Sequence, residues 1–127
     1  MNNRPIKFRA WSITGKCMYS WEQITANRGS LYKFFLWPDV YELMQFTGLF
    51  DRLGVEIYEG DIFIGFCKTK TPYIVKYGED ASFYGETVPH NGVSGAGKQT
   101  VSLLNAPQWL EVLGNIYEHQ HLLQKVR

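Results

Sequence analysis

The sequence has few cysteines and no long apolar run, and each shortage excludes a class of protein. Its 127 residues include only two cysteines, Cys17 and Cys67, and no signal peptide is recognisable. Small secreted domains are usually dense in disulfides, so we expect two reduced thiols in a cytoplasmic protein. The longest apolar stretches, Phe34–Trp37 and Ile62–Cys67, are far too short to cross a bilayer. The chain is therefore not expected to enter a membrane.

The sequence also lacks an excess of charge of either sign. Its formal net charge is +1, which removes the usual electrostatic argument for nucleic-acid binding. The basic residues gather partly at the ends, with Arg4, Lys7 and Arg9 near the start and Lys125 and Arg127 at the finish. They could form a small basic patch, but a solvated edge strand is the favoured interpretation.

Aromatic residues, in contrast, are abundant. They make up 16% of the chain, and hydrophobic residues as a whole make up 45%, which indicates a folded globular protein. Flat rings pack well across a pleated sheet, so this composition favours strands. The length fits a single domain over 1–127, within which we distinguish an N-terminal β subregion, 1–50, and a barrel-like region, 51–127.

The first third of the chain reads as strands separated by turns. Ile6–Trp11 alternates between two faces, and the turn Thr14-Gly15-Lys16 leads into Cys17–Trp21 as the second arm of a hairpin. Trp21–Thr25 either continues that strand or begins a helical turn. The aromatic run Leu31–Trp37 is predicted to be a strand ended by Pro38. Tyr41–Phe46 is predicted to be a further strand, ended by a break at Thr47-Gly48.

The remainder continues the same pattern. Asp51–Gly54 predicts a tight turn, and Val55–Tyr77 is expected to form the centre of a barrel-like core. Further short strands are predicted at Ala81–Tyr84 and Val101–Leu104, and a short helix in the tail His119–Val126. The fold class is therefore mainly β, with α+β left open. We expect a small barrel-like core, an N-terminal hairpin that forms or extends a second sheet together with the strand Leu31–Trp37, and one or two short helices.

Four blocks of the sequence resemble the YopX family of small bacteriophage and prophage proteins. In chain order they are Ile6-Lys7-Phe8-Arg9-Ala10-Trp11, Met44-Gln45-Phe46-Thr47-Gly48-Leu49, Glu56-Ile57-Tyr58-Glu59-Gly60-Asp61-Ile62 and Gly114-Asn115-Ile116-Tyr117-Glu118. The resemblance implies a phage or prophage origin, a β-rich fold and expression in the cytoplasm of a bacterial host. It implies no reaction and no catalytic residues. The chain departs from the family pattern at Arg52-Leu53-Gly54, usually a Lys-Asn-Gly turn, and at His119-Gln120-His121, usually Asn-Pro-Glu.

The glycine-rich segment Gly85–Lys98 contains a motif with the spacing of a phosphate-binding loop. Gly92–Lys98 reads GxxxxGK, but Gln99 stands where magnesium binding needs a hydroxyl, and no strand–loop–helix pattern surrounds it. A flexible connector is therefore the preferred interpretation of Gly85–Lys98, with nucleotide or small-molecule binding as an alternative. No cofactor is expected.

Two clusters of titratable residues carry weaker signals. His119 and His121 beside Glu118 could hold a metal ion if they lay on a strand, but residues that begin a helix in solvent are favoured, and no metal site is expected. The acidic residues of the Glu56–Asp61 segment could support acid–base catalysis, but no nucleophile accompanies them. We interpret them as turn residues, with Asp61 bonded to the backbone and the glutamates facing water, and we predict no catalytic residues and no enzyme.

The aromatic residues could be core, subunit interface or a stacking surface for single-stranded nucleic acid. The function expected from the sequence is that of a non-enzymatic accessory protein that binds an unknown host or phage protein and forms a homo-oligomer. A nucleic-acid-binding module is the alternative, with weak support. The candidate interaction surface consists of six residues: Trp11, Tyr32, Phe35, Trp37, Arg9 and Lys7.

Overall fold

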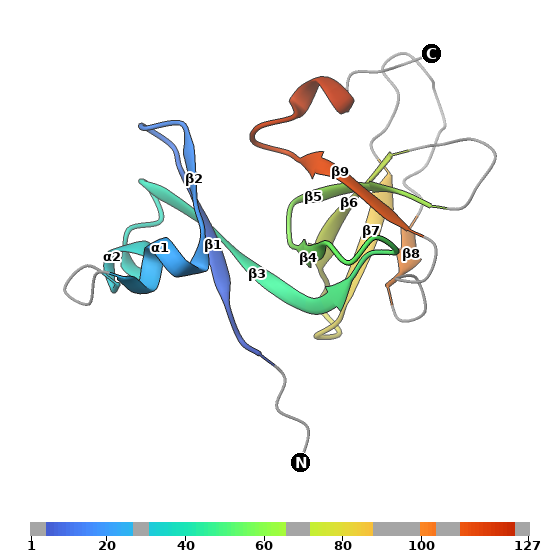
Figure 1. The fold of residues 1–127 in the computed structure, drawn as a ribbon, viewed down its shortest axis with the longest axis horizontal. Helices are drawn as coiled ribbons and strands as arrows, with labels where there is room; N and C mark the ends of the chain where they lie inside the picture. The colour runs from blue at the N-terminus through green and yellow to red at the C-terminus, as the bar shows by residue number, and fades with distance from the viewer. Residues whose placement is uncertain (1–4, 27–30, 66–71, 88–99, 104–109, 124–127) are drawn as a thin grey trace.

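A computed structural model describes residues 5–26, 31–65, 72–87, 100–103 and 110–123, and all that follows concerns these residues. They form two antiparallel sheets, with strand orders β2-β1-β3-β4 and β8-β7-β6-β5-β9 (Figure 1). The elements are β1 (Phe8–Ser12), β2 (Cys17–Tyr19), α1 (Trp21–Ala26), α2 (Lys33–Leu36), β3 (Tyr41–Phe50), β4 (Glu56–Tyr58), β5 (Asp61–Ile64), β6 (Pro72–Tyr77), β7 (Phe83–Thr87), β8 (Thr100–Ser102), β9 (Glu111–Asn115) and the 3-10 helix η2 (Gln120–Leu122). In the part of the chain described, no helix is long and apolar enough to span a membrane.

The predicted N-terminal hairpin is confirmed. β1 pairs with β2 from Ala10 opposite Tyr19 to Ser12 opposite Cys17, and the Ser12 hydroxyl accepts the Gly15 N–H in the turn. The interpretation of the basic N-terminal segment as a solvated edge strand is wrong, however, because β1 lies between β2 and β3. Cys17 is an exposed free thiol, and Cys67 lies outside the described residues.

The predicted strand Leu31–Trp37 is wrong: the second sheet exists, but it is formed by the N-terminal hairpin with β3 and β4 and does not include this segment. The segment contains the single helical turn α2, in which the Trp37 N–H donates to the Lys33 carbonyl oxygen over 3.1 Å. A strand would put alternate rings on one face, but only Phe34 enters the core here, where it packs with Ala10 and Ile24. Tertiary burial of one ring therefore outweighs the strand propensity of the run.

A second short helix, α1, precedes α2. Between the two structures considered for Trp21–Thr25, the helix is correct. Ser20 begins it with reciprocal bonds: its hydroxyl accepts the Gln23 N–H, and the Gln23 side-chain oxygen accepts the Ser20 N–H. Together α1 and α2 cover one face of the N-terminal sheet, where Ile24 and Phe34 close the smaller of two cores (Figure 1).

β3 is the longest strand and passes from the helices to the five-stranded sheet (Figure 1). Its first half pairs with β1, and its second half pairs with β4. The predicted strand Tyr41–Phe46 is confirmed, but Thr47-Gly48 is a bulge within β3 and does not end it. Gly48 has a φ of +87°, and the Thr47 hydroxyl replaces ladder bonds by donating to the Ile57 carbonyl and accepting the Leu49 N–H.

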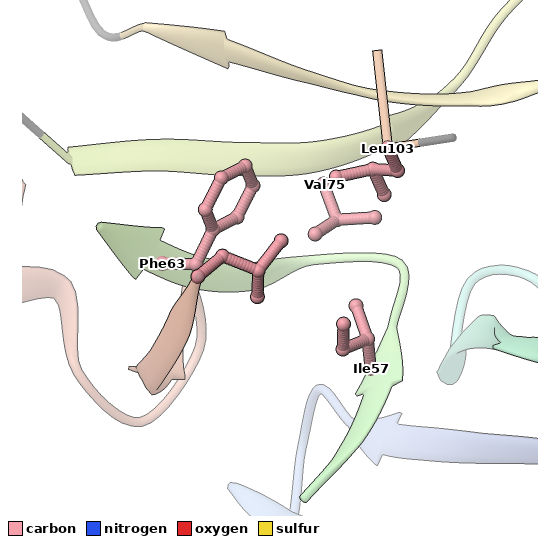
Figure 2. Close-up of a cluster of buried hydrophobic side chains, with 5 residues drawn as sticks. Ile57, Phe63, Val75 and Leu103 are labelled. Carbon is pink, nitrogen blue, oxygen red and sulfur yellow. The ribbon is translucent and has the colours of Figure 1, made fainter. Parts of the chain in front are cut away.

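The larger core lies under the five-stranded sheet. Ile57, Phe63, Val75 and Leu103 point toward one another from β4, β5, β6 and the end of β8, as Figure 2 shows. The mainly β, barrel-like fold predicted from the sequence is confirmed. The turn Asp51–Gly54 is confirmed as well, because the Asp51 carboxylate accepts the N–H groups of Leu53 and Val55.

Strand ends differ from the predicted ones in the C-terminal half. β7 begins at Phe83 and runs to Thr87, so Gly85 belongs to a strand and the predicted loop begins too early. A Cβ at Gly85 would lie 2.4 Å from Cζ of Phe63, so glycine is needed there for the sheet to close over the ring. Residues 88–98 of that segment, which include the GxxxxGK motif and His90, lie outside the described residues, as do Leu104 and 124–127. The predicted tail helix is confirmed as one turn, η2.

Candidate interaction surface

The structure divides the six candidate residues between two faces of the N-terminal sheet. Alternation along β1 sends Phe8 toward the helices, where its ring meets Phe35 at 5.4 Å between centroids. Arg9 and Trp11 point to the other face, toward Tyr58 and the C-terminal turn. Tyr32, Phe35 and Trp37 therefore lie on the helix side, and the other candidates lie on the opposite side.

On the helix side, apolar side chains remain exposed along α2. We call Tyr32, Phe35, Leu36 and Trp37 the α2 surface; their exposed fractions are 57%, 43%, 66% and 48%. Between them, Phe34 turns inward and contacts the ring of Tyr41 at 4.5 Å between centroids. A buried ring thus holds a single helical turn in place, while the neighbouring apolar side chains stay exposed.

On the other face, Arg9 forms a buried ion pair with Asp61. Nη2 of Arg9 lies 2.8 Å from Oδ1 of Asp61 and donates to the Glu59 carbonyl oxygen at 3.1 Å. The guanidinium carbon sits 4.8 Å from the ring centroid of Tyr58, and the side chains of Arg9 and Asp61 are only 14% and 3% exposed. Oδ2 of Asp61 accepts the Tyr58 N–H, so the carboxylate joins β1 to the turn between β4 and β5.

Burial sets the protonation behaviour of this cluster. It raises the pKa of Asp61, while the Arg9 guanidinium and the Tyr58 N–H oppose the rise. Burial, reinforced by the charge of Glu56, raises the pKa of Tyr58 to about 12. Every acidic group of the cluster has a partner within the protein, so the cluster links β1 to the β4–β5 turn and stabilises the fold. The Tyr58 hydroxyl, whose pKa is raised, donates to the Glu56 carboxylate at 3.3 Å.

The neighbouring charges are paired as well. Lys7 forms an ion pair with Glu56 and lies over the ring of Phe46, 4.9 Å from its centroid. Asp61 bonds to the backbone as predicted, but the expectation that the glutamates face water is wrong, because a Glu59 carboxylate oxygen accepts the Gln45 N–H at 2.8 Å. Lys7 and Arg9 therefore both form ion pairs within the protein.

Trp11 is also held within the fold. Its ring stacks on Tyr117 with 5.5 Å between centroids and an interplanar angle of 18°. The same C-terminal turn is fixed by Asn115, whose Oδ1 accepts the N–H groups of Tyr117 and Glu118. His119 lies over Gly114, where a Cβ would approach its ring to 2.5 Å, and its Nδ1 accepts the Asn115 N–H.

The paired histidines do not form a described metal site. Nδ1 of His119 is already occupied by a backbone donor, and the rings of His119 and His121 are 6.1 Å apart. No cluster of three His, Cys, Asp or Glu side chains suited to a metal ion occurs within the described ranges.

The sequence analysis does not include Leu36, which is the most exposed member of the α2 surface. The signal for it is the uninterrupted apolar run Phe34–Trp37, because a half-buried strand would alternate apolar and polar residues.

Fold and site together define a small, mainly β protein with an exposed apolar helical turn and a buried ion-pair cluster. The YopX protein family matches residues 7–124, and the chain belongs to that family. No curated protein matches the sequence. The fold is similar to the crystal structure of protein EF1440 from Enterococcus faecalis, with a TM-score of 0.60, 24% identity, and coverage of 95% of this chain and 99% of that one.

Proposed function

We propose that this YopX family member is a non-enzymatic accessory protein of phage or prophage origin. It acts in the bacterial cytoplasm by binding protein, including a second copy of itself, through the α2 surface. The observation that carries the proposal is the grouping of four exposed apolar side chains on and beside one helical turn. Contiguous exposed apolar side chains are typical of protein interaction sites, and aromatic residues contribute most of the energy at such sites.

The support of α2 by the core strengthens this proposal. Phe34 packs against Tyr19 and Tyr41, and Phe35 rests its edge on Phe8, so the exposed groups are presented by a fixed turn. A preorganised surface loses little conformational entropy when it binds. The nucleic-acid alternative has less support, since Lys7 and Arg9 are both paired with carboxylates.

Light scattering after size-exclusion chromatography tests the proposal. We expect the unmodified protein to elute as an oligomer, and Trp37→Ser combined with Leu36→Ser to shift the mass toward the monomer while the melting temperature stays within a few degrees. Leu53→Ser is the matched control, because Leu53 is 63% exposed in the turn that follows the end of β3, whereas α2 contacts Tyr41 at the start of β3. An unmodified protein that is monomeric at every concentration, or an oligomer unchanged by the α2 variants, would contradict self-association through this surface.

A further inference from the structure

The α2 surface has a charge near each of its two ends. Lys33 is the first residue of α2, and Asp39 follows the last residue, Leu36, in the turn that leads into β3. The exposed apolar side chains of Phe35, Leu36 and Trp37 lie between these two charges in the chain. The α2 surface is therefore positive at one end, negative at the other and apolar between them.

Neither of these charges has an ionic partner in the part of the chain that the structure describes. The ion pairs there involve other residues. Nζ of Lys33 lies over the rings of Phe34 and Tyr41, 5.2 and 5.9 Å from their centroids, which positions the ammonium group beside α2 but leaves its charge without an anion. Asp39 is exposed, and its side chain forms no hydrogen bond among the described residues. Both charges are therefore available to a binding partner.

The helical geometry of α2 sets which side chains are neighbours on its surface. Residues four apart lie on the same side of a helix, and the Trp37 N–H donates to the Lys33 carbonyl oxygen, so Lys33 lies beside Trp37. Tyr32 and Leu36 form the next such row, opposite the buried ring of Phe34. The positive charge thus borders the exposed apolar side chains. α2 lies at the end of the molecule away from the five-stranded sheet, where a second molecule can reach it (Figure 1).

The order of the two charges restricts the kind of partner. A partner surface that carries one sign of charge would match one end of the α2 surface and repel the other. A second copy of α2 laid antiparallel matches both ends, because a contact across a two-fold axis brings residue i to residue j and residue j to residue i. Lys33 then faces Asp39 of the partner subunit, and the reverse contact forms at the other edge. The apolar side chains meet at the centre, where interfaces are depleted in charge.

We infer that the α2 surface forms a two-fold symmetric dimer in which two copies of α2 pack antiparallel. This inference rests on the proposed function, to which it adds the identity and the orientation of the partner. Exposed ion pairs contribute little affinity, so the apolar centre supplies most of the binding energy. The two contacts between Lys33 and Asp39 of the partner subunit fix the orientation and disfavour other pairings.

Charge reversal at the two edges tests this inference. Lys33→Glu places acid against acid at both edges, and Asp39→Lys places base against base. Each variant alone should raise the dimer dissociation constant in sedimentation equilibrium by about tenfold, and molar salt should reduce that loss. In an equimolar mixture of the two variants, a heterodimer has opposite charges at both edges. Native mass spectrometry with one variant isotope-labelled should therefore show the heterodimer in excess over both homodimers.

Lys16→Glu is the matched control for the charge change. It makes the same reversal in the exposed turn between β1 and β2 and should leave the dissociation constant unchanged. Asp39 forms no hydrogen bond or ion pair among the described residues, so Asp39→Lys and its salt dependence decide the result if Lys33→Glu lowers the melting temperature.

The outcomes separate this inference from the proposed function. Charge-reversed homodimers as stable as the unmodified dimer would overturn the antiparallel pairing, and so would a mixture without excess heterodimer from variants that melt normally. Self-association through the α2 surface would still stand if Trp37→Ser combined with Leu36→Ser dissociated the protein. An unmodified protein that is monomeric at every concentration would overturn both the antiparallel dimer and the proposed self-association.

Discussion

The pairing of Arg9 with Asp61 makes a quantitative prediction about stability. Asp61→Asn keeps the size of the side chain and the oxygen that accepts the Tyr58 N–H, so it removes mainly the charge. It leaves Arg9 without its anion at a position where the arginine side chain is only 14% exposed. Breaking one partner of a buried ion pair costs about 3–5 kcal/mol, and we expect the lower end because Arg9 keeps some contact with water.

The reverse variant and the double variant complete a thermodynamic cycle. Arg9→Met keeps the packing over Tyr58 but strands the Asp61 charge, and should also cost about 3 kcal/mol. The double variant should lose less than the sum, with a coupling energy of about 1–3 kcal/mol, because neither charge remains unpaired. Equilibrium urea unfolding followed by tryptophan fluorescence measures all four free energies of unfolding.

The chain supplies a matched control pair. Arg52 and Glu111 are 2.7 Å apart, but their side chains are 48% and 32% exposed. The same cycle there, with Arg52→Met and Glu111→Gln, should give a coupling of only about 0.2–1 kcal/mol. Additive losses at Arg9 and Asp61, or equal coupling in the two pairs, would show that burial does not make the first pair the stronger link.

Three further perturbations have defined outcomes. In urea titrations, Gly60→Val should lower the free energy of unfolding by more than Gly54→Val. Both glycines have a positive φ, but of the two only Gly60 would bring a Cβ against a neighbour, 3.1 Å from Sδ of Met44. Asn115→Ala should cost about 1–3 kcal/mol by leaving two N–H donors unpaired, and thermal melts would show the loss. Burial raises the pKa of Tyr58 in the folded state to about 12, so the contribution of its neutral hydroxyl to the free energy of unfolding is complete below pH 10 and is lost as the pH rises to 12. Tyr58→Phe should therefore make the free energy of unfolding in urea less dependent on pH between pH 10 and 12. An unchanged slope would contradict burial as the cause of the raised pKa.

Local patterns in the sequence predict much of the fold. The alternation of β1, the Thr14–Lys16 turn and the Asp51–Gly54 turn depend on neighbouring residues, and the structure confirms all three. α2 could not be predicted this way, because one helical turn has little intrinsic stability and is held by contacts of Phe34 with Tyr19 and other distant strand residues.

The site was less accessible to sequence reasoning than the fold. Tyr32, Phe35 and Trp37 are exposed. The neighbouring sequence does not show which side chains of the predicted strand Leu31–Trp37 would face water, and the segment is in fact a helical turn. The Arg9–Asp61 pair joins residues 52 positions apart, and its existence follows from packing β1 against the β4–β5 turn. A glycine that ends a strand and a glycine that forms a bulge within one have the same local signal, so the sequence predicts an end at Thr47-Gly48 where the structure has a bulge.

The position of β9 has a consequence for the protein during its synthesis. β5 is covered on one side by β6 and on the other by β9, with Asp61 opposite Asn115 and Ile64 opposite Glu111. A ribosome delivers β5 and β6 before β9, so the nascent sheet has an uncovered flank while the residues between Tyr77 and Glu111 are synthesised. Chains that terminate prematurely before residue 111 would keep this flank and should coaggregate with one another, whereas release of β9 from the exit tunnel seals it.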